Sequence, residues 1–150
     1  MAKYRSNLPQ QEGGLFLTDA GIETTLIFHD GHDLPYFAAF DLLKDQAGRA
    51  ALKRYFSTHA AIATANGHGF IFESPTWRAS SDWGSKLGYS EADMAEANRQ
   101  SIAMLVELRG IFETETSPMV ISGCVGPRGD GYDAGELMTA DDAEAYHTPQ

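Results

Sequence analysis

The sequence predicts an α/β protein with a parallel sheet, because three short apolar segments alternate with two long amphipathic helices. The apolar segments lie at residues 15–18, 69–73 and 119–122, and each is followed by loop-forming residues. Apolar strands separated by helices pair in parallel, since a right-handed crossover returns the chain to the same end of the sheet. The expected order is therefore β-α-β-α-β, with a further helix beginning shortly before residue 150.

The first long helix is expected between Asp45, which can cap its amino terminus, and Asn66-Gly67, which is a typical stop. Its apolar face is formed by Leu52, Tyr55, Phe56, His59, Ile62 and Ala63. These positions recur every three or four residues, which is the spacing of one face of an α-helix. The segment therefore predicts a helix that packs against the sheet.

The second long helix begins with Ser90 and Asp93, which resemble a capping box with Asp in place of Glu. Its apolar stripe comprises Met94, Ala97, Ser101, Met104, Leu105, Leu108 and Phe112. Thr139 and Asp142 predict the cap of the last helix. Each of the three predicted helices therefore has a polar capping residue at its amino terminus.

Composition narrows the class of protein. The chain has 150 residues, 43% of them hydrophobic, and 11 Lys and Arg stand against 21 Asp and Glu. Nucleic acids and anionic membranes require a basic surface, so we expect neither as a partner. The single cysteine excludes a disulfide framework and favours a reducing, cytoplasmic location. Residues 1–14 are polar and lack a signal-peptide segment, and we expect them to form a loose arm of one unit, residues 1–150.

Functional groups of parallel α/β proteins gather beyond the carboxyl ends of the strands, so the segments that follow the three strands are the candidate site. Asp19, Ala20 and Gly21 follow the first strand. The Asp19 carboxylate could hold the amino group of a ligand while nearby N–H groups meet the ligand's carboxylate. Alternatively, Asp19 only stabilises a turn.

Thr76 and Trp77 follow the second strand and supply a hydroxyl and an aromatic wall. An extended backbone would point Trp77 away from the side on which Thr76 and Arg78 lie. Glu73 ends the apolar segment and is costly to bury without a partner. It is therefore either paired with Arg78 or Arg128, or it is an acid of the site.

The loop after the third strand, residues 123–131, is rich in glycine. It could form an anion-binding nest, although its spacing matches neither the P-loop nor the dinucleotide fingerprint, or its glycines could only permit a sharp turn. Cys124 could be a thiolate nucleophile or a metal ligand, or it could be inert packing, and the chain has no second cysteine to share a metal.

Three segments, taken in order, resemble the homocysteine S-methyltransferase family. Residues 19–26, Asp-Ala-Gly-Ile-Glu-Thr-Thr-Leu, are similar to the family's Asp-Gly-Gly…Thr-(Glu/Gln)-Leu opening. Residues 74–80, Ser-Pro-Thr-Trp-Arg-Ala-Ser, are similar to its Thr-Asn-Thr-Tyr-Gln-Ala-Ser segment. Residues 122–129, Ser-Gly-Cys-Val-Gly-Pro-Arg-Gly, are similar to its Gly-Ser-x-Gly-Pro-x-Gly loop. The resemblance extends over nearly the whole chain from about Leu15.

This resemblance implies a (β/α)₈ TIM barrel that transfers a methyl group from a small-molecule donor to the sulfur of homocysteine, giving methionine. In the family a zinc ion, held by three cysteine thiolates, lowers the pKa of the homocysteine thiol so that a thiolate attacks the methyl group. The resemblance places Asp19, Ala20 and Gly21 around the amino-acid end of homocysteine. It places Thr76 and Trp77 along the pocket towards the donor.

The chain departs from the family pattern at Ala20, which replaces a Gly, and at Pro75 and Arg78, which replace Asn and Gln. Cys124 lies where the family usually has Ser. The family's zinc cysteines belong to the second half of the barrel, the last two within a Gly-Gly-Cys-Cys segment that this sequence lacks. We therefore expect this chain alone to bind no zinc.

A (β/α)₈ barrel needs about 200 residues at the least, so these 150 residues supply only part of one, with three of the strands. Two interpretations remain open: the N-terminal part of a methyltransferase barrel that needs its other half for activity, or a non-catalytic half-barrel without zinc. A third is a small anion-binding domain that uses residues 126–131. Because an open barrel edge exposes unpaired backbone, we expect self-association.

Overall fold

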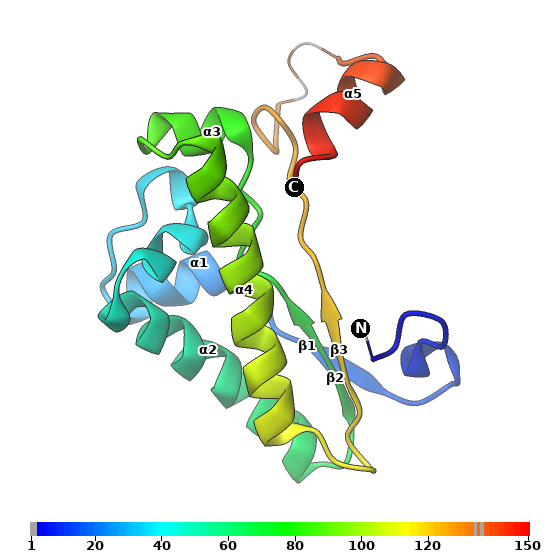
Figure 1. The fold of residues 1–150 in the computed structure, drawn as a ribbon. Helices are drawn as coiled ribbons and strands as arrows, with labels where there is room; N and C mark the ends of the chain where they lie inside the picture. The colour runs from blue at the N-terminus through cyan, green and yellow to red at the C-terminus, as the bar shows by residue number, and fades with distance from the viewer. Residues whose placement is uncertain (1–2, 134, 136) are drawn as a thin grey trace.

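A sheet of three parallel strands organises the chain (Figure 1). The strands are β1 (Phe16–Thr18), β2 (Gly69–Glu73) and β3 (Met119–Ser122). β2 lies in the middle, and the register places Leu17 beside Phe70 and Phe70 beside Met119. The predicted β-α-β-α-β order with parallel strands is confirmed. The structure is a computed structural model that describes residues 3–133, 135 and 137–150.

Two long helices connect the strands and cover one face of the sheet (Figure 1). They are α2 (Gln46–Ala65) and α4 (Glu91–Phe112). The predicted caps are confirmed: the Asp45 carboxylate accepts a hydrogen bond from the N–H of Gly48 at 2.7 Å, and Ser90 and Asp93 form a reciprocal capping box. These bonds satisfy main-chain donors that have no partner within the helix.

The hydrophobic core lies between the helices and the sheet. Phe70 and Phe72 point from β2 towards α2, where the Phe56 ring contacts Phe72 edge-on at 6.1 Å between ring centroids. Leu105 and Leu108 of α4 complete this layer and are fully or almost fully buried. Burial of these large apolar side chains is the main force that holds the crossovers on the sheet.

Two details differ from the sequence-based expectation. β1 is an edge strand rather than a buried one: Phe16 and Leu17 are half-buried, Thr18 is exposed, and Leu15 before it has 60% of its surface exposed. Ile62, expected on the buried face of α2, is 52% exposed. The buried face of α2 contains Leu52, Phe56 and Ala63. Because an α-helix has 3.6 residues per turn, positions spaced by three or four residues drift around the helix, and Ile62 therefore lies on the solvent side.

The shorter helical segments have too few residues for a periodic pattern, so the sequence does not predict them. They are η1 (Pro9–Gln11), α1 (Ile22–Thr24), the π-helical turn η2 (Thr25–His29), η3 (Pro35–Phe37), η4 (Ala39–Lys44) and α3 (Ser81–Lys86). The predicted final helix is present as α5 (Ala140–His147), and the Thr139 hydroxyl accepts a hydrogen bond from the N–H of Asp142. α5 lies beyond the carboxyl ends of the strands (Figure 1).

The amino-terminal arm is attached to the far end of the sheet. Lys3 Nζ lies 2.5 Å from Glu113 Oε2, and the hydroxyl of Tyr4 donates a hydrogen bond to the same carboxylate. The N–H of Met119, at the start of β3, donates to Glu113 Oε1 at 3.0 Å. Within the described residues, no helix is both long and apolar enough to cross a membrane.

We predict opposite effects for two Gly→Ala substitutions in these helices. A Cβ at Gly48 would lie 2.1 Å from the main-chain oxygen of Leu42, so Gly48→Ala forces α2 away from η4 and should lower the free energy of unfolding by about 1–3 kcal/mol. Gly110 of α4 has open space around it, and Gly110→Ala should raise this free energy by about 1 kcal/mol.

Urea denaturation followed by circular dichroism measures both variants. The two changes in the free energy of unfolding need not be equal in size, but Gly48→Ala must lower it and Gly110→Ala must raise it. A stabilised Gly48→Ala protein would show that α2 and η4 do not approach as closely as described.

Candidate functional site

The segments that follow the three strands meet around one cavity of about 240 Å³. Its lining comes from all three: Asp19, Ala20, Gly21, Ile22, Glu23, Glu73, Ser74, Pro75, Trp77 and Cys124. The predicted site residues Asp19, Ala20, Gly21 and Trp77 are therefore neighbours in space. Parallel pairing explains this, since it brings every carboxyl end to the same edge of the sheet.

The turn after β1 presents the Asp19 carboxylate. Gly21 adopts a left-handed backbone, φ 66°, which a residue without Cβ reaches at little cost and which turns the chain into α1. Oδ1 of Asp19 accepts a long hydrogen bond from the N–H of Glu73 at 3.4 Å, and Oδ2 accepts one from the hydroxyl of Tyr55 at 3.0 Å. Burial raises the pKa of Asp19 despite these bonds.

Two further carboxylates make the cavity acidic. Glu23 and Glu73 both line it, and burial, followed by the charges of Asp19 and Glu73, raises the pKa of Glu23. Sequence reasoning missed Glu23, although its place two residues after Gly21 could have pointed to it. Three carboxylates at one small cavity favour a cationic group such as an ammonium.

Glu73 has neither of the ion-pair partners proposed from the sequence. Arg128 pairs with Asp82 at 2.9 Å, and Arg78 donates a hydrogen bond to the main-chain oxygen of Gly129 at 3.1 Å. The salt-bridge interpretation was wrong because Glu73 is exposed at the end of β2 and needs no counter-ion for burial. Its position on the cavity agrees with the other alternative, an acid of the site.

Thr76, which the resemblance places along the pocket, does not line the cavity at Asp19 but closes a ring of hydrogen bonds between two loops. Its hydroxyl donates to the main-chain oxygen of Cys124 at 2.7 Å, so the Ser74 hydroxyl, 2.7 Å from Thr76 Oγ1, is the donor between these two side chains. Ser74 Oγ in turn accepts from the N–H of Cys124 at 2.9 Å. The ring continues the β2–β3 pairing past the end of the sheet.

Arg78 stacks between the only two tryptophans of the chain. Its guanidinium carbon lies 3.9 Å from the ring centroids of both Trp77 and Trp83. The backbone turns at Trp77 and does not stay extended, so the alternation expected of an extended segment does not apply to Trp77 and Arg78. Arg78 is only 5% exposed, and it holds the cavity wall Trp77 against α3 and the Gly129 loop.

The glycine-rich loop, residues 123–131, needs glycine because it passes close to Trp77, and not because it forms an anion-binding nest. None of its glycines at 123, 126, 129 and 131 has a positive φ. A Cβ at Gly126 would lie 2.0 Å from the main-chain oxygen of Trp77, so only glycine fits where this loop crosses the second strand's end. The loop therefore packs against Trp77, and its geometry does not favour the anion-binding alternative.

Cys124 is half-buried and lines the cavity. Burial, followed by the carboxylate of Glu73, raises the pKa of its thiol to about 12, so the side chain is a neutral thiol near neutral pH. Among the residues that the structure describes, no group of three His, Cys, Asp or Glu side chains could hold a metal ion. The described residues therefore do not fit a zinc site by themselves.

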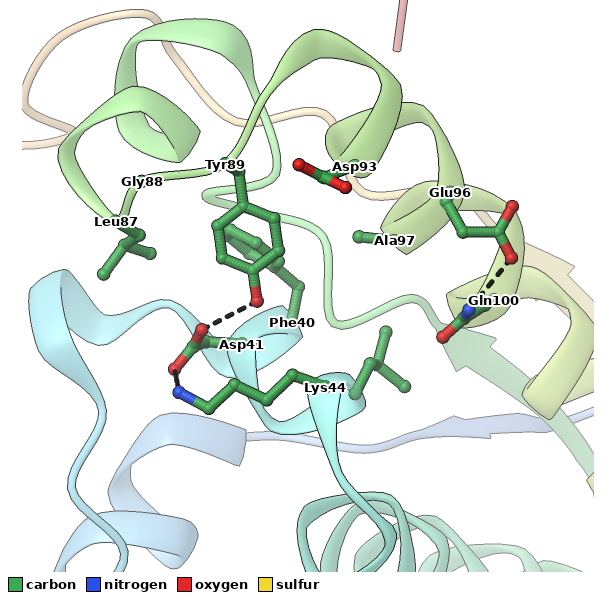
Figure 2. Close-up of a pocket in the computed structure, with 11 residues that line it drawn as sticks. Phe40, Asp41, Lys44, Leu87, Gly88, Tyr89, Asp93, Glu96, Ala97 and Gln100 are labelled. Atoms are coloured by element: carbon green, nitrogen blue, oxygen red, sulfur yellow. Dashed lines mark hydrogen bonds and ion pairs between the residues drawn. The ribbon is translucent and has the colours of Figure 1, made fainter.

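A second cavity, of about 410 Å³, lies between η4 and α4 and not at the strand ends. Figure 2 shows its polar side chains bonded to one another: the Tyr89 hydroxyl donates to Asp41 Oδ1 at 2.8 Å, and Lys44 donates to Oδ2 at 2.6 Å. Glu96 and Gln100 also pair, at 2.9 Å. These groups already have partners within the chain, which favours a structural role.

Parallel strands with crossover helices on one face, and a cavity beyond their carboxyl ends, are the arrangement expected of part of a (β/α)₈ barrel. A model of the family described as Homocysteine S-methyltransferase matches residues 16–150. The chain belongs to this family, and the predicted resemblance is confirmed. No curated protein matches the sequence.

The fold is shared with the homocysteine methyltransferase MmuM from Escherichia coli, which has been solved in metallated and oxidized forms. The TM-score is 0.70 for both structures, with sequence identities of 17% and 18%. Each comparison covers 97% of this chain, and 51% and 50% of the two solved chains. This chain thus spans about half the length of those structures, which agrees with the predicted partial TIM barrel.

The raised pKa of Cys124 predicts slow alkylation. At pH 8 its reaction with iodoacetamide should be about a thousandfold slower than that of an ordinary exposed cysteine, because the thiolate is the reactive form. Removing the neighbouring charge with Glu73→Gln lowers the thiol pKa and should speed the reaction, about tenfold for each unit of pKa.

Mass spectrometry of the modified chain gives both rates across pH 7–10, roughly the range in which thiols titrate. Glu115→Gln is the matched control, since this exposed carboxylate lies between α4 and β3, at the opposite end of the sheet. A rate for Glu73→Gln equal to that of the control would contradict the role given to Glu73.

Proposed function

We propose that this chain supplies the homocysteine-binding part of a methyltransferase that methylates the sulfur of homocysteine to give methionine. One observation carries the proposal: the Asp19–Gly21 turn, Glu23, Glu73 and Trp77 line a single acidic cavity at the carboxyl edge of the sheet. The family assignment supplies the substrate class. In this proposal the cavity receives the amino-acid end of homocysteine.

The carboxylate of Asp19 binds the α-ammonium group of homocysteine. Glu23 and Glu73 add negative charge beside it, which strengthens the attraction for a cation. Main-chain N–H groups at Ala20 and Gly21 meet the substrate carboxylate, and the methyl group of Ala20 narrows this approach. Together they orient the amino acid so that its thiol points away from the acidic turn.

Methyl transfer forms a bond between the homocysteine sulfur and the methyl carbon. The bond from that carbon to the donor breaks, its electron pair remains with the donor, and the proton of the thiol passes to water. The indole ring of Trp77, which the family resemblance places towards the donor, forms the wall on this side of the cavity. Thr76 contributes by holding the loop of Cys124 in place.

The family uses zinc to activate the thiol, but the described residues do not provide its ligands. We therefore assign no step of the reaction to a metal held by this chain. Binding and orientation of homocysteine are the roles that its own residues can perform. In keeping with the negative charge of the chain, small molecules are the proposed partners, and the cytoplasm is the proposed location.

Loss of the Asp19 charge tests this function. L-Homocysteine binding to the 150-residue chain is measured by isothermal titration calorimetry under reducing conditions. Asp19→Asn should weaken binding about tenfold or more, because a hydrogen-bonded charge pair with the ammonium is lost. Glu115→Gln removes one carboxylate at the opposite end of the sheet and should bind like the unaltered chain.

Equal affinities for Asp19→Asn and Glu115→Gln would count against Asp19 as the ammonium ligand. Absence of any homocysteine binding by the unaltered chain would overturn the proposed function itself.

A second candidate is a non-catalytic half-barrel, which the open edges of the described sheet favour. Within the described sheet, β1 and β3 are each paired on one side only. In this case their outer edges associate with other copies of the chain. Sedimentation velocity should show association that rises with concentration. The same sample should form no methionine from homocysteine with S-methylmethionine, S-adenosylmethionine or betaine, and turnover with any of these donors would exclude this candidate.

A further inference from the structure

Tyr55 reaches the candidate site from the middle of α2. Its hydroxyl lies 3.0 Å from Oδ2 of Asp19 and 3.0 Å from the main-chain oxygen of Ala20. A phenol has one proton, so these two acceptors share it. Tyr55 therefore bonds to two consecutive residues of the turn that presents the Asp19 carboxylate, although sequence reasoning had placed it only on the apolar face of the helix.

The ring of Tyr55 is held firmly on the helix. It is 4% exposed and contacts the ring of Phe56 at 5.2 Å and that of His59 at 4.6 Å between centroids. His59 Nδ1 also lies 3.0 Å from the main-chain oxygen of Tyr55. A side chain packed on both sides presents its hydroxyl in one position, which is what orientation of a second group requires.

The hydroxyl remains a donor at every physiological pH. Burial, followed by the charge of Asp19, raises the pKa of Tyr55 far above that of an ordinary phenol. The proton therefore stays on the tyrosine and is not transferred to Asp19. Tyr55 thus supports Asp19 by donation rather than by proton transfer.

The surroundings of Asp19 make this donor important. The groups that face Asp19 are Tyr55 and His59 from α2, Glu23 from α1, Glu73 from β2 and Cys124 from the loop after β3. The two glutamates repel a charged Asp19, and the N–H of Glu73 is a distant donor at 3.4 Å. The bond from Tyr55 is the shorter of the two bonds to the carboxylate.

We propose that Tyr55 is a positioning residue, whose hydroxyl orients the Asp19 carboxylate towards the cavity and keeps it ready to receive the ammonium group of the amino-acid substrate. This inference rests on the proposed function for the identity of the ligand. A carboxylate has about four acceptor positions, and the two bonds described leave others for the substrate.

The test compares Tyr55→Phe with Tyr89→Phe. Tyr89 is a matched control, because its hydroxyl also donates to a buried carboxylate, Asp41 Oδ1 at 2.8 Å, but at the second cavity (Figure 2). Carbon-13 NMR of aspartate-labelled chains follows the titration of Asp19 without ligand. Removal of a bond that lowers the pKa should raise the pKa of Asp19 in Tyr55→Phe and leave it unchanged in Tyr89→Phe.

Calorimetry with L-homocysteine provides the second readout. Tyr55→Phe should bind about 3- to 10-fold more weakly at pH 7. On acidification it should lose binding at a higher pH than the unaltered chain, since Asp19 takes up its proton earlier. Tyr89→Phe should match the unaltered chain in both respects, even if it is less stable.

A merely structural Tyr55 would lower stability in the same way as Tyr89 and leave the Asp19 titration where it was. That result, or unchanged homocysteine affinity in Tyr55→Phe, would overturn the inference. If the unaltered chain binds no homocysteine, the proposed function fails, and the ligand-free titration alone then decides whether Tyr55 controls Asp19.

Discussion

The parallel pairing of β2 with both of its neighbours is the constraint on which the rest of the structure depends. Because all three strands run in one direction, the chain must cross back over the sheet twice, and α2 and α4 are these crossovers. Their apolar stripes and the large rings of β2 form the core. The same pairing brings the segments after Thr18, Glu73 and Ser122 to one edge, and the cavity lies there.

Beyond the sheet, hydrogen bonds rather than apolar contacts arrange the loops. Ser74 and Thr76 join the loop after β2 to the main chain of Cys124, and the Tyr55 hydroxyl joins α2 to the turn after β1. These bonds hold carboxylates close together, and burial then raises the pKa of Asp19. A cluster of like charges opposes folding, so its retention at the strand ends agrees with a site that receives a cation.

The tryptophan–arginine stack shows how the chain adapts its family's pattern. Arg78, which stands in place of a family Gln, occupies the space between Trp77 and Trp83 and ties α3 to the cavity wall. Gly126 allows the loop after β3 to pass close to the main chain of Trp77. The cavity wall at Trp77 is thus held by residues from three different segments, while the acidic turn after β1 is held by Tyr55 of α2.

The sequence by itself determined the strands, the two long helices, their caps and the family, because these follow from local periodicity, capping chemistry and short motifs. It also identified Asp19, Ala20, Gly21 and Trp77 as neighbours, since parallel strands bring their carboxyl ends together. Only the tertiary structure decided the partners of these residues. Tyr55 contacts Asp19 although the two residues lie 36 positions apart in the sequence. Arg78 stacks on Trp77 because the backbone turns there, and no periodic pattern predicts that turn. Side-chain partners of this kind depend on how far each helix slides along the sheet, which local sequence does not encode.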